Sequence, residues 1–330
     1  MPMSSAAISV VILNWNGKQD TLACLTSLQE CTYPALDIIV VDNGSTDGSA
    51  AAIRSQFPSL HLIENPINSG FAEGNNIGIR SALDRGAKYI LLLNNDTLVA
   101  RNLFEAFLDG FAKLPAAGIL GAKICLYDKK DTLDHLGGMW NPQTATFDFI
   151  GLRAKEEESQ WQESLELDYV CGAAMMFRKE VFQTAGLFDP RFFLIWEESD
   201  LCLRAKKHGF SVFTCPEAKI WHKVSASFVG GKPHSTYFWW RNRMLWIERN
   251  CSPKEKRSLY MRILLPEIAH MLKIRLLKKM QLFFLTPFAS PEDLLEKKKK
   301  LLGNRAALCG IRDYFLRRFG NGPTWIYKAK

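Results

Sequence analysis

One pattern recurs through the first hundred residues: a short apolar run stops at Asn or Asp, and a helical pattern follows. The runs are ISVVILN (8–14), LDIIVVDN (36–43) and KYILLLNND (88–96). Their Ile, Val and Leu content is typical of strands that are buried on both faces. Strands that alternate with helices predict an α/β fold, with a mostly parallel sheet and helices on both of its faces.

The polar residues that end these runs are the first candidates for a functional site. They are Asn14 in the first run, the segment DNGSTD (42–47) in the second, and NND (94–96) in the third. In a doubly wound sheet the carboxyl ends of parallel strands line one crevice, where such folds bind ligands. Asn and Asp also favour turns, so turn chemistry alone is the alternative explanation.

The sequence offers no familiar phosphate cradle at these strand ends. The first turn, NWNGKQD, contains neither G-x-G-x-x-G nor a Walker A motif. Gly70, Gly74 and Gly78 are instead spaced by four residues. Such glycines could bring the backbone close to a nucleotide sugar, or they could allow close packing of a helix.

Six motifs occur in a fixed order along the chain: VVILNWNG, IIVVDNGSTDGS, NSGFAEGNNIGI, ILLLNNDT, GAAMMFRKEVFQTAGLFDPRFFLIWEESDLCLRAKKHGF and IWHKVSASF. Together they resemble an inverting family 2 glycosyltransferase of the GT-A fold, within the bacterial rhamnosyltransferase-like subgroup that assembles cell-surface polysaccharides. The resemblance covers residues 8 to about 245. It implies transfer of a sugar from an NDP-sugar donor linked to dTDP or UDP, such as dTDP-L-rhamnose. The acceptor would be a hydroxyl of a glycan or of a polyprenyl-diphosphate-linked sugar.

The resemblance also implies roles for the first two strand ends. Asp42 would hydrogen-bond the pyrimidine ring, and Asn14 would line the same pocket. Asn43 and Asp47 would support the turn that follows. The remaining residues expected to bind the nucleotide sugar are Gly70, Asn75, Asn94 and Asn95.

A metal site is implied at the third strand end. The triplet 94–96 stands where the family carries its Asp-x-Asp signature, so Asp96 would ligate Mn²⁺ or Mg²⁺. The first acidic position of that signature is Asn94 here, which removes one charge. His222 matches the histidine that completes the metal site in some relatives, and an imidazole ligand favours Mn²⁺ somewhat.

The general base is expected in FFLIWEESDLCLR. An inverting displacement needs one base to take the proton of the acceptor hydroxyl. Glu198 is the leading candidate, Glu197 the next, and Asp200 is expected to support the helix or the metal loop. Acidic residues in a first helical turn are also favoured by the helix dipole, which is the structural alternative. Trp196 could stack on an acceptor sugar, or it could be buried.

The C-terminal hundred residues carry most of the positive charge. The chain has 42 Lys and Arg against 34 Asp and Glu, a net charge of +8. Residues 231–330 hold 22 basic and 7 acidic residues, a net charge of +15. This asymmetry suggests a polyanionic partner, either nucleic acid or an anionic membrane surface. No nucleic-acid-binding motif accompanies the charge, so we expect no nucleic acid.

We therefore expect a GT-A catalytic domain at residues 1–235 and a basic, largely helical region at residues 236–330. The stretch YFWWRNRMLWIERN (237–250) resembles an interfacial helix that would contact a membrane. Alternatively, the region packs on the catalytic core with a solvated basic face. The N-terminus lacks a basic n-region and the eight cysteines are scattered, so we expect a cytoplasmic protein, peripheral on the inner face of the membrane if the tail binds lipid.

Three rival functions remain open from the sequence. A nucleotide-sugar-binding protein without turnover is conceivable because of Asn94 and Glu198. A nucleotidyltransferase of the same fold would need a Gly-rich basic loop that VVILNWNGKQD lacks. A scaffold at the membrane surface would not need the polar strand ends.

Overall fold

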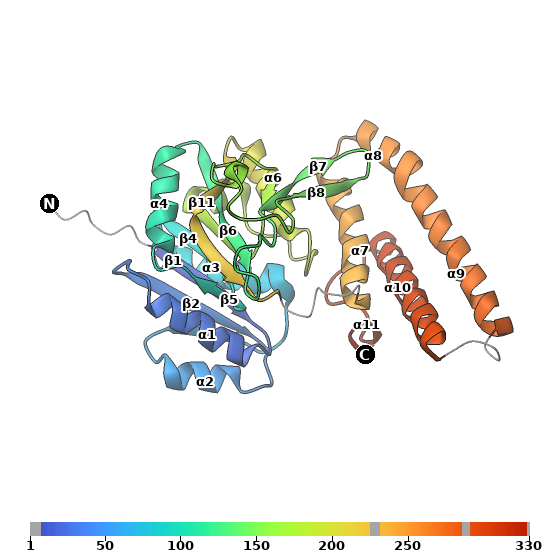
Figure 1. Cartoon of the computed structure of the whole chain (residues 1–330), viewed down its shortest axis with the longest axis horizontal. Helices are drawn as coiled ribbons and strands as arrows, with labels where there is room; N and C mark the ends of the chain where they lie inside the picture. The colour runs from blue at the N-terminus through green and yellow to red at the C-terminus, as the bar shows by residue number, and fades with distance from the viewer. Residues whose placement is uncertain (1–7, 225–231, 286–290, 329–330) are drawn as a thin grey trace. The chain divides into compact units, whose positions relative to one another are not determined.

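The computed structural model describes residues 8–224, 232–285 and 291–328, and the chain divides into two compact units (Figure 1). Each unit is built from segments that are separated in sequence. The first unit comprises Met1–Met139, Phe147–Pro190 and Glu197–Ser225. The second comprises Trp140–Thr146, Arg191–Trp196 and Ala226–Lys330.

An eight-stranded sheet forms the centre of the first unit. Its strands, in the order in which they lie side by side, are β3 (His61–Asn65), β2 (Leu36–Asn43), β1 (Ile8–Asn14), β4 (Tyr89–Asn94), β10 (Ala174–Arg178), β6 (Ala117–Leu126), β11 (Ser211–His222) and β5 (Thr97–Val99). β3, β2, β1 and β4 run parallel, as do β6 and β11. β10 is antiparallel to both neighbours, and β5 to β11. The predicted α/β class with a mostly parallel sheet is confirmed.

Helices cover both faces of this sheet. Apolar side chains of β1 alternate between the faces: Val10 and Ile12 belong to one core cluster and Val11 to the other, and all three are fully buried. The first cluster includes residues of α1 (Lys18–Gln29), α2 (Ser49–Gln56) and α4 (Leu103–Lys113). The second includes residues of α3 (Gly70–Asp84), α5 (Lys179–Ala185) and α6 (Glu197–Lys207).

Two of the three spaced glycines are explained by helix packing. A Cβ atom on Gly74 would lie 2.5 Å from Leu13 Cδ1, and one on Gly78 would lie 2.3 Å from Val11 Cγ1. These separations are far below ordinary van der Waals contact, so the glycines allow α3 to lie close to β1. Gly70 differs, because it begins α3 with a φ of +87°.

Two sequence patterns give a wrong prediction of local structure. The segment 129–164 has no regular apolar spacing and predicts an irregular stretch, yet it contains β7 (Gly137–Asn141), β8 (Thr146–Ile150) and a 3₁₀ turn (Ser159–Trp161); β7 and β8 form a small sheet with β9 (Tyr169–Val170). Gly137 has no side chain to mark a strand, and a Cβ there would lie 2.1 Å from the Tyr169 carbonyl oxygen. The second pattern is FSVFTCPEAKIWHK, which predicts a strand pair or ribbon. It is one strand, β11, with an irregularity between Cys215 and Lys219.

The second unit is largely helical, which confirms the predicted helical C-terminal region. Its helices are α7 (Pro233–Asn250), α8 (Pro253–Leu259), a π-helical turn (Tyr260–Leu264), α9 (Leu265–Leu285), α10 (Pro291–Phe315) and α11 (Trp325–Lys328). α10 packs against α7 (Figure 1). A small core joins Phe193 with Tyr237, Phe238, Ala306 and Ile326. Within the described ranges, no helix is both long and apolar enough to cross a bilayer.

Candidate active site

The ends of β1 and β2 hold a pre-formed polar pair. The strands pair in register, with Asn14 opposite Asp42. Asn14 Nδ2 donates to Asp42 Oδ1 at 2.6 Å and to Ser45 Oγ at 3.1 Å. Asn14 Oδ1 accepts a hydrogen bond from Thr21 Oγ1 at 2.8 Å. Asn14 and Asp42 are buried, so this arrangement is fixed before any ligand arrives.

Asn43 anchors the loop that leads into α3. Its Oδ1 accepts hydrogen bonds from Asn65 Nδ2 at 2.9 Å and from the Ser69 amide at 3.1 Å. Its Nδ2 donates to Asn68 Oδ1 and to the Gly70 carbonyl, each at 3.1 Å. The loop from Asn65 to Gly70 is therefore held against the end of β2 by one buried amide.

Asp47 ties the start of α1 to the start of α2. Its Oδ2 accepts from the Lys18 amide and its Oδ1 from the Ser49 amide, each at 3.0 Å. Burial would raise the pKa of Asp47, but the hydrogen bonds from Ser49 and from the Lys18 amide outweigh it and lower the pKa. The carboxylate thus stabilises two helix starts that flank the crevice.

The amides of the third strand end have different surroundings. Asn95 Nδ2 lies 3.3 Å from Asn14 Oδ1, so Asn95 joins the polar pair of the first two strands. Asn94 ends β4 and is half-buried. Asn75 is buried within α3, where its Nδ2 donates to the Phe71 carbonyl at 2.9 Å. The structure therefore places Asn95 with Asn14, whereas Asn75 bonds to its own helix.

His222 lies between two carboxylates. The antiparallel pairing of β5 with β11 sets His222 opposite Thr97, beside Asp96. His222 Nε2 is 3.2 Å from Asp96 Oδ1, and His222 Nδ1 is 3.0 Å from Asp134 Oδ2. Burial would lower the pKa of His222, but the hydrogen bonds with Asp134 and Asp96 outweigh it and raise the pKa to about 10. The two carboxylates therefore favour the positively charged, protonated form of the His222 imidazole.

The Asp96–His222 pair fits two ligands of one divalent metal. Ligands bound at about 2.1 Å and at right angles stand about 3 Å apart, close to the observed 3.2 Å. Asp134 holds the other ring nitrogen of His222, the usual arrangement behind a metal-bound histidine. Within the described residues, no group of three or more His, Cys, Asp or Glu side chains could hold a metal. Other ligands would have to come from substrate or water.

Glu197 and Glu198 are adjacent acids at the start of α6; Glu197 is buried and Glu198 is half-buried. Within the described part of the chain, the Oε2 atom of each is buried without a hydrogen-bond partner. Burial raises the pKa of both, and for Glu197 the charge of Glu198 adds to the effect. A carboxylate with a raised pKa is suited to accept a proton near neutral pH.

Gly172 lies beside one of these carboxyl groups. A Cβ atom on Gly172 would stand 3.7 Å from Glu198 Oε1. The neighbouring Cys171 amide donates to the Leu136 carbonyl at 3.2 Å, and Leu136 lies two residues after Asp134. The chain that carries Asp134 is therefore a hydrogen-bonded neighbour of the segment facing Glu198. This pairing brings the histidine site and the acid pair to one region of the first unit.

Asp200 and Trp196 have other surroundings. Asp200 is fully buried and forms an ion pair with Arg204 at 2.9 Å, within α6. Trp196 belongs to the second unit and is only 6% exposed. Its ring lies 5.9 Å from that of Trp246 and 6.4 Å from that of Trp140.

Sequence reasoning missed Ser45 and Asp134. Ser45 could have been suspected, because it lies within the polar segment after the second strand. Asp134 could not, because its partner His222 is 88 residues away and its surroundings gave no strand pattern. Residues from 225 onward in the motif IWHKVSASF lie outside the described residues.

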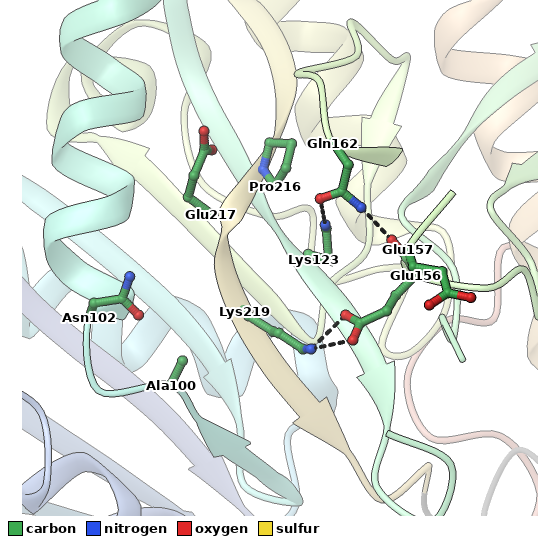
Figure 2. A pocket seen from close by; sticks show the side chains of 9 residues that line it. All are labelled: Ala100, Asn102, Lys123, Glu156, Glu157, Gln162, Pro216, Glu217 and Lys219. Atoms are coloured by element: carbon green, nitrogen blue, oxygen red, sulfur yellow. Dashed lines mark hydrogen bonds and ion pairs between the residues drawn. The ribbon is translucent and has the colours of Figure 1, made fainter. Parts of the chain in front are cut away.

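A separate polar pocket of about 550 Å³ lies on the first unit (Figure 2). Lys219 Nζ contacts Glu156 Oε1 at 2.6 Å, and Lys123 Nζ donates to Gln162 Oε1 at 2.8 Å. Both amines are thus engaged, so we do not assign a diphosphate site here. The pocket is lined by Ala100, Asn102, Lys123, Glu156, Glu157, Gln162, Pro216, Glu217 and Lys219.

Comparison with known proteins decides the family. A family model described as Glycosyl transferase family 2 matches residues 9–186, more than half of the chain. The chain belongs to glycosyl transferase family 2. This confirms the resemblance to a family 2 glycosyltransferase inferred from the motifs.

Two family 2 relatives are rhamnosyltransferases. The chain is 27% identical over 264 residues to the N-acetylglucosaminyl-diphospho-decaprenol L-rhamnosyltransferase of Mycobacterium tuberculosis. This match covers 68% of this chain and 83% of the relative. It is 28% identical over 255 residues to dTDP-rhamnosyl transferase RfbF of Shigella flexneri, covering 74% and 81% of the two chains.

Solved structures support the GT-A fold. The mannosyltransferase PcManGT from Pyrobaculum calidifontis, in complex with GDP-Man and Mn²⁺, matches with a TM-score of 0.55 at 16% identity. That match covers 96% of this chain and 89% of the other. GalNAc-T7 with UDP, GalNAc and Mn²⁺ matches with a TM-score of 0.57 at 16% identity, over 74% of this chain and 48% of the other.

Proposed function

We propose that this family 2 glycosyltransferase is metal-dependent and inverting. It moves a sugar from an NDP-sugar, such as dTDP-L-rhamnose, to a hydroxyl of a glycan or lipid-linked acceptor. The observation that carries the proposal is the acid pair Glu197–Glu198, whose Oε2 atoms are buried, in the same region of the unit as the Asp96–His222 pair. The two rhamnosyltransferase relatives support the donor class, and the name of the mycobacterial relative supports a polyprenyl-diphosphate-linked acceptor.

The base of the nucleotide would bind at Asp42. Its two oxygens accept from Asn14 Nδ2 and from the Ser45 amide, at 2.6 and 3.2 Å. A carboxylate has about four acceptor sites, so Asp42 can accept one more hydrogen bond. Thymine and uracil each present a ring N–H donor, which favours dTDP or UDP as the leaving nucleotide. Asn43, Gly70 and the amides at 94 and 95 would complete the donor site.

Asp96 and His222 would hold Mn²⁺ or Mg²⁺. When bound, the metal supplies Lewis-acid neutralisation of the charge that develops on the departing diphosphate. Asp96 provides the anionic ligand and His222 Nε2 the neutral one, after loss of the proton that the two share. Asp134 keeps the imidazole oriented through Nδ1, at 3.0 Å.

Glu198 would act as the general base. Its carboxylate takes the proton from the acceptor hydroxyl, and the hydroxyl oxygen forms a bond to the anomeric carbon of the donor sugar. The bond from that carbon to the diphosphate oxygen breaks at the same time, and the nucleoside diphosphate leaves. Attack from the face opposite the leaving group inverts the configuration. The hydroxyl would approach Glu198 Oε1, which lies beside Gly172.

The catalytic residues of this proposal lie within residues 1–235, and residues 236–330 would face a membrane. One side of the chain from the π-helical turn into α9 exposes Met261, Leu265, Leu272 and Leu276, whose exposed fractions run from 48% to 63%. The surrounding region carries the excess of Lys and Arg. Apolar and basic side chains on one helix suit an anionic lipid surface. Replacing Leu272 and Leu276 with Glu should abolish sedimentation with anionic vesicles and leave transfer to a water-soluble acceptor unchanged; unchanged sedimentation would refute the assignment.

Nucleotide binding and turnover test the enzymatic proposal together. Melting temperatures with dTDP, UDP, GDP and CDP, each with and without Mn²⁺, should rise for one pyrimidine diphosphate in the presence of metal. Product formation from the matching NDP-sugar then separates an enzyme from a nucleotide-sugar-binding protein without turnover. No shift with any nucleotide, and no product, would refute the donor site described above.

A further inference from the structure

The loop Arg191–Trp196 adopts a backbone that its residues do not favour. Phe193, Ile195 and Trp196 have φ angles of 63°, 72° and 80°. L-residues other than Gly are uncommon in this left-handed region, and a β-branched residue such as Ile195 is an outlier there. The sequence RFFLIW contains no glycine to relieve the strain. Such a conformation persists only where surrounding contacts hold it.

Helix α7 supplies those contacts. Asn242 Nδ2 lies 2.7 Å from each of the Phe192, Leu194 and Ile195 carbonyl oxygens. Both Asn242 and its neighbour Arg241 are fully buried. One amide group therefore lies within hydrogen-bonding distance of three carbonyl oxygens of the strained loop.

Arg241 binds the start of the same loop. Its NH2 group donates to the Arg191 and Phe192 carbonyls at 3.0 and 2.7 Å. Its NH1 group donates to the Gly320 carbonyl at 2.6 Å. The guanidinium thereby links the loop to the Gly320 carbonyl near the C-terminal end of the second unit, and its Nε donates to Asn242 Oδ1 at 3.0 Å.

Aromatic contacts hold the side chains of the loop. The ring of Phe193 stacks on Phe238 with a centroid distance of 5.3 Å and an interplanar angle of 11°. Trp196 meets Trp239 edge to face at 6.2 Å. Phe238 and Trp239 precede Arg241 on α7, so one helix contacts both the backbone and the side chains of the loop.

We propose that Arg241 and Asn242 are positioning residues for the acid pair. The chain leaves the first unit after Pro190, passes through the clamped loop and returns at Glu197, so the loop backbone sets where α6 begins. The orientation of Glu198 toward an acceptor depends on that starting point. This inference rests on the proposed role of Glu198 as base. It assigns the helical region a task in catalysis that is separate from membrane contact.

The kinetic test compares neighbouring residues of one helix. Asn242→Ala and Arg241→Lys should each lower kcat about 10²-fold, because a misplacement of about 1 Å has that effect. The affinity for the nucleoside diphosphate with Mn²⁺ should stay within about threefold, since the donor site lies elsewhere in the sequence. Asn242→Gln should restore part of the rate, because it keeps the amide donor.

Arg243→Lys is the matched control. Arg243 is on the same helix and is equally buried, but its donors bind the Thr144 and Ala145 carbonyls and Glu267. It should change the melting temperature without a comparable loss of kcat. An equal loss of kcat in Asn242→Ala, Arg241→Lys and Arg243→Lys would overturn the proposal in favour of a general structural role. A loss of nucleotide binding in Asn242→Ala would do the same.

Tryptic cleavage provides a readout that does not depend on activity. In the wild type the Arg191 carbonyl is held by Arg241, so cleavage after Arg191 should be slow. In the full-length Asn242→Ala and Arg241→Lys proteins this bond should be cut faster, giving a fragment that ends at Arg191 by mass. Unchanged cleavage would refute the clamp. A wild-type rate for Glu198→Gln, together with faster cleavage in the clamp variants, would instead refute the assignment of the base.

Discussion

The two units bury polar side chains in opposite ways. At the strand ends of the first unit, amides and carboxylates bond to one another, and Asp42 keeps spare acceptor capacity, as does Glu198 at the start of α6. On α7 of the second unit, Arg241, Asn242 and Arg243 give their N–H groups to backbone carbonyls. The first arrangement suits binding of a ligand. The second fixes the course of the chain.

This difference changes the interpretation of the basic tail. Residue counts alone suggest that its charge of +15 faces a polyanion. Arg241 and Arg243, however, are completely buried, and Arg243 forms an ion pair with Glu267 at 2.6 Å. Burial of a charge is costly unless it is paired and hydrogen-bonded, and here the bonds to carbonyl oxygens meet that need. Part of the tail's charge is therefore structural.

The comparison predicts that substitutions at the strand ends and at the acid pair of α6 change activity far more than stability. The largest effect is expected for Glu198→Gln, which should lower kcat by up to about 10⁴-fold because the proton acceptor is lost. Because the pKa of Glu198 is raised, wild-type kcat should increase with pH through that pKa, and the variant should lose this increase. Steady-state rates across pH measure both effects, and a variant that keeps the pH dependence would show that another group is the base.

Asp96→Ala should follow, with a loss of about 10³-fold in kcat/KM, since a metal stabilises the leaving group by several kcal/mol. Metal-dependent affinity for dTDP or UDP should disappear while the circular dichroism spectrum is retained. Calorimetric titration with and without Mn²⁺ measures the affinity. The same affinity in the variant and the wild type would remove Asp96 from the site.

Substitutions of buried polar residues in the second unit should change stability more than activity. Arg243→Met leaves the carbonyls of residues 144 and 145 and the carboxylate of Glu267 without their donor. The free energy of unfolding should fall by about 3 kcal/mol, since two backbone carbonyl oxygens lose their hydrogen bonds to a charged donor. Denaturant unfolding measures the change. Arg257→Met, at an exposed position on α8, is the control and should stay within about 0.5 kcal/mol.

Glycine substitutions sharpen the comparison inside each unit. Gly78→Ala should destabilise the protein by about 2 kcal/mol, because the new methyl group would overlap Val11 in a packed core. Gly303→Ala, in α10, should instead stabilise by up to about 1 kcal/mol, since no atom lies within 4 Å of the new Cβ. Thermal unfolding of the two variants should therefore shift in opposite directions. A shift in the same direction would contradict the packing described for α3.

The smallest effect concerns pH and Glu197. Its pKa is raised in the folded protein by burial and by Glu198, so the folded state binds more protons than the unfolded state above pH 4.5. Stability from this group is present at low pH and is lost as pH rises, by at most about 1.4 kcal/mol per pH unit. Glu197→Gln should reduce that slope and raise the melting temperature more at pH 7.5 than at pH 4.5. An equal change at both values would mean that the pKa is not raised.

The sequence by itself determined the α/β class, the parallel half of the sheet and the family, because buried strands and strand-end polar residues leave local patterns. Ile8–Asn14 and Leu36–Asn43 are strands for reasons visible within each run. The ends of α6 are also marked locally. The helix begins at Glu197 with three acidic residues in its first turn, and it is followed by Gly209, which has a φ of +89°.

Only the tertiary structure decided which distant residues share a site. Asp134 meets His222 across 88 residues, and Asn242 meets Ile195 across 47, at positions where no local pattern marks either contact. The strained loop before Glu197 was equally invisible, because RFFLIW has none of the residues that favour a left-handed backbone. A residue's backbone preference reflects its own side chain and its neighbours in sequence. The left-handed conformations of this loop are instead stabilised by groups that approach only when the whole chain has folded.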